Sequence, residues 1–297
     1  LTGGVASGSG DNGKGGAIYS DEGNLEIVHS CVTNNIAEKG GGVYQYTGAL
    51  NVSNSTFSDN IATIHGGGVA IQDGASLMLH SVKIYSNVAN SNPWPNGGGG
   101  IYASNTDICN ISHSQLNNNN ANWGGGLMDN GGKQLRISYT NVTNNYAGVT
   151  GGGFRFVSSK LETSILLKYV VIANNVGQYG GAGMHIQATY IAIFSSIIKH
   201  NRIIIHSDGY GWVSADGCLV DSDSNLRNSR NLTNPRLIQQ LFERPFLTVP
   251  YMGRGLGDSD VESKLKSGVT AGERKPCNLA GVSIHPERMN ICLFGNP

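Results

Sequence analysis

An eleven-residue block that recurs seven times, with no gap inside it, constrains the fold of this chain more than any other feature. Positions 1, 3 and 8 of the block are apolar in every copy, and position 11 is always Asn. From Asn35 to Asn201 is 166 residues in six steps, so the mean repeat is about 28 residues. The seven copies are residues 25–35, 50–60, 77–87, 109–119, 135–145, 165–175 and 191–201.

A second recurring motif, a run of small residues rich in Gly, lies between the blocks. In most copies it is followed by an apolar residue, as in Gly66-Gly67-Gly68-Val69 and Gly98-Gly99-Gly100-Ile101. Gly permits a backbone with positive φ and a close approach to neighbouring chain. Gly accounts for 43 of the 297 residues, about twice its usual share, as expected for a chain that turns often.

The alternation of positions 1 and 3 is that of one face of a strand, and a fixed period indicates a stacked repeat architecture. The sequence predicts an all-β fold, a right-handed parallel β-helix of about seven to eight coils over residues 13–212. Two or three short strands are expected in each coil. At about 4.8 Å per rung the helix would be roughly 35–40 Å long.

The Asn at position 11 is expected at a bend, where its amide can donate to one neighbouring coil and accept from the other. The sequence therefore predicts one inward-facing ladder. Its members are Asn35, Asn60, Asn87, Asn119, Asn145, Asn175 and Asn201.

These motifs resemble the repeats of polymorphic outer membrane proteins and related β-helix adhesins. Gly15-Gly16-Ala17-Ile18 is similar to the first family motif, and Phe57-Ser58-Asp59-Asn60 to the second. The resemblance covers about residues 13–212. It implies a secreted or surface-displayed β-helix with adhesive or structural roles.

Enzymes also use this fold, so catalysis must be judged from residues. Glycoside hydrolases need paired carboxylates and lyases need acidic calcium ligands. Asn105-Thr106-Asp107 resembles one polygalacturonase fragment, but the residues that should accompany it are missing. His29 and His113 share position 5 three coils apart, and we interpret them as surface side chains. We therefore expect no catalytic residue, no cofactor and no metal site.

Composition bears on partners and location. The formal net charge is zero, which gives no electrostatic reason to expect nucleic acid or an anionic membrane as a partner. No apolar run is long enough to span a bilayer. The chain begins at Leu1, and we expect a mature product or a fragment of a secreted, extracellular or cell-surface protein. Leu1 to Lys14 shows no obvious cap for the helix.

We divide the chain into a β-helix at residues 1–217 and a cap or assembly tail at residues 218–297. Two short helices are expected in the tail, one beginning at Asn234-Pro235 and one at the capping box from Ser259 to Glu262. The tail either covers the last open rung or docks on another subunit.

The cysteines and sequons complete the candidate residues. Cys109 lies in an inward column and is expected to be a buried free thiol, whereas Cys31 is at an outward position. Cys277 with Cys292 is the favoured disulfide. N-glycosylation is possible at the five sequons, Asn51, Asn54, Asn110, Asn141 and Asn231.

Together these features favour an extracellular structural protein, the subunit of a surface fibre or filament and so a homo-oligomer. The filament would assemble through the β-helix ends and the tail, because an open rung favours strand addition and a head-to-tail contact does not close. The alternative is a monomeric adhesin that binds glycans or cells. A polysaccharide lyase or glycoside hydrolase is a more distant alternative.

Overall fold

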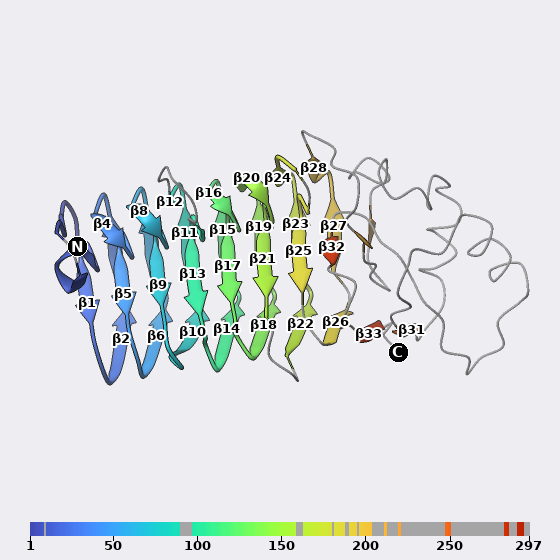
Figure 1. Cartoon of the computed structure of the whole chain (residues 1–297), viewed down its shortest axis with the longest axis horizontal. Coiled ribbons are helices and arrows are strands. Elements are labelled where there is room, and N and C mark those ends of the chain that lie inside the picture. The colour runs from blue at the N-terminus through green and yellow to red at the C-terminus, as the bar shows by residue number, and fades with distance from the viewer. Residues whose placement is uncertain are drawn as a thin grey trace, which may run out of the picture.

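Parallel strands stacked coil on coil make up the fold in the computed structural model, which confirms the expected all-β parallel β-helix. The structure describes residues 1–203 apart from residues 9, 90–96, 159–162, 180, 188–189 and 195. Beyond these it describes five short strands at residues 211–212, 219–220, 247–250, 282–284 and 290–293. The coils follow one another along the long axis, from blue to yellow in Figure 1.

Each coil contains four strands, where the sequence suggested two or three, so four sheets run along the described helix. The first sheet contains β1 (Ile18–Ser20), β5 (Val43–Gln45), β9 (Val69–Ile71), β13 (Ile101–Ser104), β17 (Leu127–Asn130), β21 (Phe154–Val157) and β25 (Met184–Gln187). The second contains β2 (Asn24–Val28), β6 (Ala49–Ser53), β10 (Ser76–His80), β14 (Ile108–Ser112), β18 (Gln134–Ser138), β22 (Ser164–Lys168) and β26 (Tyr190–Phe194).

The third and fourth sheets close the coil. The third contains β3 (Cys31–Thr33), β7 (Thr56–Ser58), β11 (Lys83–Tyr85), β15 (Gln115–Asn117), β19 (Asn141–Thr143), β23 (Val171–Ala173) and β27 (Ile197–Lys199). The fourth contains β4 (Ile36–Lys39), β8 (Ile61–His65), β12 (Val88–Ala89), β16 (Asn120–Trp123), β20 (Tyr146–Thr150), β24 (Val176–Gly177) and β28 (Arg202–Ile203). We number the coils 1 to 7 by these groups of four, so the described helix makes six full turns from β1 to β25.

The repeat positions pair in register across the coils. Leu77 of β10 faces Leu50 on one side and Cys109 on the other, which forms the column of position 1. Ile84 lies between Phe57 and Leu116 in the column of position 8. These residues are fully buried. The interior is thus lined by stacked aliphatic columns, whose burial is the main favourable term in folding.

The first sheet adds an inward column that comes from the residue after each Gly run. Val43, Val69, Ile101, Leu127 and Phe154 are stacked in it, and all are fully buried. The Gly run before them allows the coils to approach. A Cβ at Gly99 would lie 2.5 Å from the carbonyl oxygen of Gly125, far inside van der Waals contact.

The first residues of the chain form a partial rung in front of coil 1. Thr2 bridges to Thr33 and Val5 bridges to Ile36, both in the parallel sense. The backbone N–H of Gly4 donates to the side-chain oxygen of Asn35 at 2.9 Å. Residues 1–6 therefore occupy the same register as residues 32–37, a relation that the Gly-rich composition of this segment conceals.

Short strands from the rest of the chain extend three of the sheets. β32 (Val282–Ile284) pairs in parallel with β25, β33 (Asn290–Leu293) with β26, and β30 (Leu219–Val220) with β27. β29 (Gly211–Trp212) and β31 (Leu247–Pro250) then add in the antiparallel sense. The two predicted tail helices and the boundary near residue 217 lie outside the described residues.

The described part contains one helix, the short 3-10 helix η1 (Gly10–Gly13). Within the residues that the structure describes, no helix has the length and apolar character needed to cross a bilayer.

Candidate functional site

The seven asparagines at position 11 form a buried ladder at the turn between the third and fourth sheets. Each side-chain N–H of one coil donates to the side-chain oxygen of the next, over distances of 2.9–3.1 Å from Asn35 through to Asn201. The same oxygen accepts the backbone N–H of the preceding Asn, as Asn119 does from Asn87 at 3.1 Å. The side chains therefore satisfy backbone groups that the turn leaves without strand partners.

A second polar row lies at the turn between the second and third sheets, at position 6 of the block. The hydroxyl of Ser114 accepts the backbone N–H of Val82 at 3.0 Å, and the hydroxyl of Thr140 accepts that of Ser114 at 3.2 Å. These hydroxyls are buried. Both rows are structural, because their hydrogen bonds are made within the protein.

The residues just before these two rows adopt the left-handed conformation. Position 5 residues His29, His113, Tyr139 and Tyr169 have φ between 49° and 55°, and so do the position 10 residues, with Asn118 at 54°. A side chain in this conformation is uncommon and costs about 1–3 kcal/mol. The left-handed residue turns the chain from one sheet to the next and directs its own side chain outward at the corner.

The cysteines and sequons lie as follows. Cys109 is buried and unpaired, and burial raises the pKa of its thiol well above the usual value, whereas Cys31 is exposed. Cys277 lies outside the described residues, and for Cys292 only its place in β33 is described, so their pairing stays a prediction. The sequon residues Asn51, Asn54 and Asn141 are exposed and Asn110 is half-buried, while Asn231 lies outside the described part.

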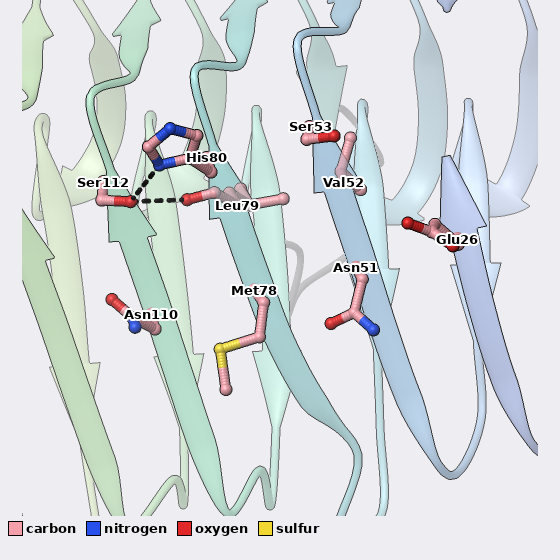
Figure 2. A pocket seen from close by; sticks show the side chains of 9 residues that line it. All are labelled: Glu26, Asn51, Val52, Ser53, Met78, Leu79, His80, Asn110 and Ser112. Atoms are coloured by element: carbon pink, nitrogen blue, oxygen red, sulfur yellow. Dashed lines mark hydrogen bonds between the residues drawn. The ribbon is translucent and has the colours of Figure 1, made fainter. Parts of the chain in front are cut away.

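A shallow groove of about 220 Å³ crosses the outer face of the second sheet (Figure 2). Its walls come from β2, β6, β10 and β14, so four successive coils contribute to it. The lining residues are Glu26, Asn51, Val52, Ser53, Met78, Leu79, His80, Asn110 and Ser112. Amide, hydroxyl and imidazole groups predominate, with one thioether and one carboxylate.

An exposed stack of rings borders this groove along the corner between the second and third sheets. The ring centroids of His80 and His113 are 5.1 Å apart, those of His113 and Tyr139 are 4.8 Å apart, and those of Tyr139 and Tyr169 are 4.8 Å apart. The last two pairs are nearly parallel. We call these four residues the ring stack, and Tyr139 within it is 51% exposed.

The outer face of the first sheet is covered by side chains of the protein itself. Tyr44, Ala70, Tyr102 and Met128 are buried there in a second apolar cluster. Near the N-terminus, Lys14 lies with its ammonium nitrogen 4.9 Å from the centre of the Tyr44 ring. This face is therefore packed, and it offers less free surface than the second sheet.

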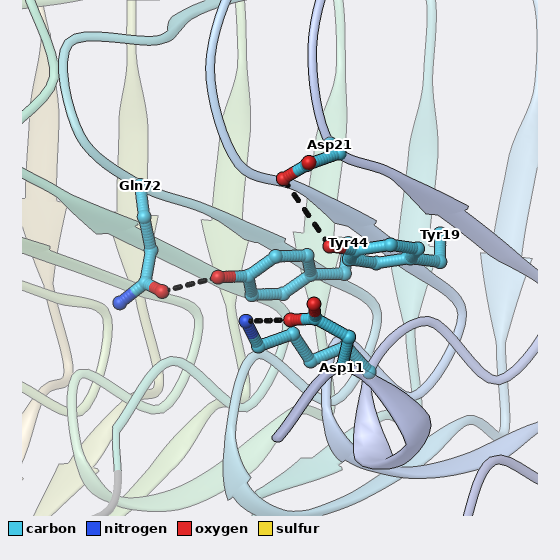
Figure 3. A network of polar contacts seen from close by, with 6 residues as sticks. Asp11, Tyr19, Asp21, Tyr44 and Gln72 are labelled. Atoms are coloured by element: carbon cyan, nitrogen blue, oxygen red, sulfur yellow. Dashed lines mark hydrogen bonds and ion pairs between the residues drawn. The ribbon is translucent and has the colours of Figure 1, made fainter.

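Figure 3 shows the polar groups at this end of the first sheet. The Lys14 ammonium contacts Asp11 at 2.7 Å, and the Tyr19 hydroxyl donates to Asp21 at 3.2 Å, while the Tyr44 hydroxyl donates to Gln72. Desolvation, with the charges of Asp11 and Asp21, raises the pKa of Tyr19 to about 12. Tyr19 therefore stays neutral at physiological pH and acts as a hydrogen-bond donor.

Two basic side chains cover the same face farther along the helix. The ring of His65 stacks on Tyr102 with centroids 4.1 Å apart, and burial, helped by the charge of Lys39, lowers its pKa to about 4. The Arg155 guanidinium lies 4.3 Å from the Trp123 ring centre, and burial lowers its pKa to about 10. Both positions are explained by packing on the outer first sheet.

Two acidic residues farther along the helix each contact a group of the protein itself. Asp107 forms an ion pair with Lys133 at 2.6 Å, and Asp129 accepts the backbone N–H of Gly132 at 3.0 Å. Glu26 is the one carboxylate of the groove. Among the described residues, no three His, Cys, Asp or Glu side chains are grouped so that they could hold a metal ion.

Comparison with protein-family models, with curated proteins and with solved structures gives no match. The candidate site is accordingly defined by geometry alone. The ladder positions follow directly from the invariant Asn of the repeat. The sequence analysis missed the ring stack, although His113, Tyr139 and Tyr169 share position 5 in successive coils. Only His80, at position 4 of its block, is not aligned with the other three.

Proposed function

We propose that this chain is an extracellular structural protein, a rigid β-helix rod that binds an extended glycan in the groove on the outer face of its second sheet. The groove carries the proposal. It is an open concave surface that combines hydrogen-bonding side chains from several coils. The asparagine ladder and the hydroxyls at position 6, by contrast, make their hydrogen bonds inside the protein.

The side chains of the groove suit a neutral sugar polymer. The amides of Asn51 and Asn110 can each donate and accept, as can the hydroxyl of Ser53. They lie on β6 and β14, with Met78 of β10 between them as an apolar contact. Because the rungs are about 4.8 Å apart, a chain lying across the strands meets a new row of groups at every rung. Such a surface favours an extended ligand over a compact one.

The side chains of the groove favour binding of a glycan without cleavage. Hydrolysis of a glycosidic bond normally requires two carboxyl groups that flank the bond. Of the nine side chains lining the groove, Glu26 alone is acidic. A bound glycan would therefore be held and left intact.

The test is the binding of the full chain to a panel of immobilised polysaccharides, with Asn51→Ala and Asn110→Ala as the groove variants. Asn141→Ala is the matched control, because Asn141 is an exposed residue of β19 on the third sheet. We expect at least one neutral polysaccharide to bind, with a loss of about tenfold or more in each groove variant, as expected for losing hydrogen bonds of about 1–1.5 kcal/mol. Equal binding by all three variants would refute the groove as the site.

Release of products must be measured in the same samples. New reducing ends or unsaturated sugars from a bound polysaccharide would contradict the proposal and support a hydrolase or a lyase. Intact polymer after prolonged incubation is the expected result.

The second candidate function is the subunit of a surface fibre, and one observation favours it. Val5, Ile36 and Ile61 are stacked in register on the outside of the fourth sheet, and they are 66%, 41% and 41% exposed. A contiguous apolar column on a surface is often covered by another protein, and a second copy of the rod could lie against it.

Sedimentation of the full chain at several concentrations tests this candidate. Ile61→Lys should abolish assembly if the column is an interface, whereas Thr63→Lys on the same strand, also exposed, is the control. A wild-type chain that stays monomeric at high concentration would exclude the fibre.

A further inference from the structure

His80 and His113 form the only pair of adjacent exposed imidazoles in the described part of the chain, and they come from different coils. His80 ends β10 of coil 3, and His113 follows β14 of coil 4 in the left-handed conformation, with φ of 51°. Their ring centroids are 5.1 Å apart and their planes are tilted by 56°. The left-handed turn brings a position 5 side chain beside a position 4 side chain of the preceding coil.

The tautomer of the neutral His80 ring follows from its contact with Ser112. The Nδ1 atom of His80 is 3.1 Å from the Ser112 hydroxyl oxygen, and that hydroxyl in turn donates to the carbonyl oxygen of Leu79 at 3.3 Å. A hydroxyl has one proton, so with its own proton directed at Leu79 it accepts from Nδ1–H. The lone pair of neutral His80 is therefore on Nε2, which Figure 2 shows at the side of the ring away from Ser112.

His113 is held by the ring stack. The Tyr139 ring lies on it with centroids 4.8 Å apart and planes 16° from parallel, and Tyr169 lies on Tyr139 in the same way. One face of the His113 ring is thus covered by an aromatic ring, while the residue as a whole is exposed.

We propose that His80 and His113 together chelate a divalent transition-metal ion. An imidazole nitrogen binds zinc at about 2.0–2.1 Å, which places each ring centre about 3.2 Å from the ion. Two ring centres 5.1 Å apart then subtend an angle of about 105° at the ion, between the square-planar and tetrahedral values that these metals adopt. The contact of His80 with Ser112 is the kind of second hydrogen bond that orients metal-binding histidines.

The ligand set indicates which ions bind. Imidazole suits copper, nickel and zinc, and the affinity of such a site rises from nickel to copper(II) and falls again to zinc. Water completes the coordination, since no third His, Cys, Asp or Glu is grouped with the pair in the described residues. The ion is therefore exchangeable and open to an additional ligand from outside. This site does not depend on the glycan proposal, because a metal ion can bind whether or not the groove holds a polymer.

Titration calorimetry of the full chain with copper(II), nickel(II) and zinc(II) salts at pH 7.5 tests the proposal. The variants are His80→Ala and His113→Ala, and the matched control is His29→Ala, which removes another exposed position 5 histidine that has the same left-handed backbone. Two linked ligands gain from the high effective concentration of the second. We expect affinity to fall about 100-fold in each of the first two variants and to stay unchanged in the control. Background sites elsewhere in the chain remain in all four proteins.

Electron paramagnetic resonance of the copper(II) protein reports directly on the nitrogen atoms bound to copper. It therefore distinguishes the loss of a ligand from a defect in folding. The wild type should show two equatorial nitrogen ligands, and His80→Ala and His113→Ala should each lose this signal. Ser112→Ala should retain both nitrogens but weaken binding about tenfold, because the hydrogen bond that orients the His80 ring is lost. A wild-type spectrum with one nitrogen, or equal affinity in His80→Ala and His29→Ala, would overturn the proposal.

Discussion

Replacing Asn119 by Ala removes one member from the middle of the asparagine ladder, and the structure lets the cost be worked out group by group. Its side-chain oxygen accepts the backbone N–H and the side-chain N–H of Asn87, both at 3.1 Å. Its side-chain nitrogen donates to the carbonyl oxygen of Ile84 and to Asn145, both at 3.0 Å. All these groups are in the buried interior.

The substitution leaves the Asn87 backbone N–H without its partner and removes one hydrogen bond from the Ile84 carbonyl. An unsatisfied buried group costs about 1–3 kcal/mol, so two of them predict a loss of about 2–6 kcal/mol in the free energy of unfolding. The side chain of Asn87 also donates to Phe57 and Tyr85, and it therefore adds little to this loss.

Urea unfolding followed by circular dichroism measures the effect, provided that the slope against urea is unchanged. Asn120→Ala is the matched control, because Asn120 is the next residue and its side chain is exposed. Surface substitutions usually change stability by less than about 0.5 kcal/mol. If Asn119→Ala is no more destabilising than Asn120→Ala, the ladder does not stabilise the helix in the way we infer.

Three further predictions concern the core, the outer first sheet and the cysteines. Gly99→Ala should destabilise the fold more than Gly74→Ala in the same urea assay, because a Cβ at Gly99 meets the carbonyl oxygen of Gly125. A Cβ at Gly74 meets nothing within 4 Å, and its only cost is a φ of +79°, which Gly99 does not have; equal losses would contradict this. Since the pKa of His65 is lowered to about 4 from 6.5, the unfolded chain binds this proton first as pH falls. Stability should therefore be unaffected by His65 above about pH 6.5 and decrease from there toward pH 4, and His65→Phe should remove that part of the pH dependence in thermal unfolding. If the substitution leaves the pH profile unchanged, folding does not lower the pKa of His65. Native protein should react with a thiol reagent at Cys31, so Cys31→Ser should remove a rapidly reacting thiol, whereas Cys109→Ser should leave the rapid phase unchanged because that thiol is buried and its pKa is raised.

A final prediction connects glycosylation with the groove. Asn51 and Asn110 line the groove, whereas Asn54 and Asn141 are exposed away from its lining. A glycan on Asn51 or Asn110 would occupy the space that the proposed ligand needs. Peptide mass mapping of material from a eukaryotic host should find sugar at Asn54 or Asn141, and full occupancy of Asn51 would contradict binding in the groove.

The sequence predicts those strands in which buried and exposed residues alternate. It does not reveal the strands that lack this alternation, so the number of strands per coil was underestimated. β10 shows buried Leu77 and Leu79 between more exposed neighbours, and this period of two predicts a strand with one inner face. In β13, by contrast, Ile101, Tyr102 and Ala103 are all buried, because side chains from the neighbouring turn cover the outside. Without alternation the segment after the Gly run does not read as a strand, which is why four strands per coil were not expected.

The candidate site could be predicted less completely from the sequence than the fold, because it depends on the geometry of a turn. The ladder asparagines share one position in every coil, so their stacking follows from the repeat alone. His80 and His113 occupy different positions, and their contact depends on the left-handed conformation of His113. His is enriched among the non-Gly residues that adopt positive φ, but this preference is too weak to predict the conformation of a single residue.

The asparagine ladder also has a direction. Every side-chain bond between two members runs from the nitrogen of one coil to the oxygen of the next coil along the chain. Removing a member therefore harms the two neighbouring coils unequally. The coil before it loses the partner of a backbone amide, while in the coil after it the Asn145 oxygen still accepts the backbone N–H of residue 119 at 3.0 Å. Local opening should spread from such a defect toward the N-terminus, with faster hydrogen exchange at the amide of Asn87 than at that of Asn145.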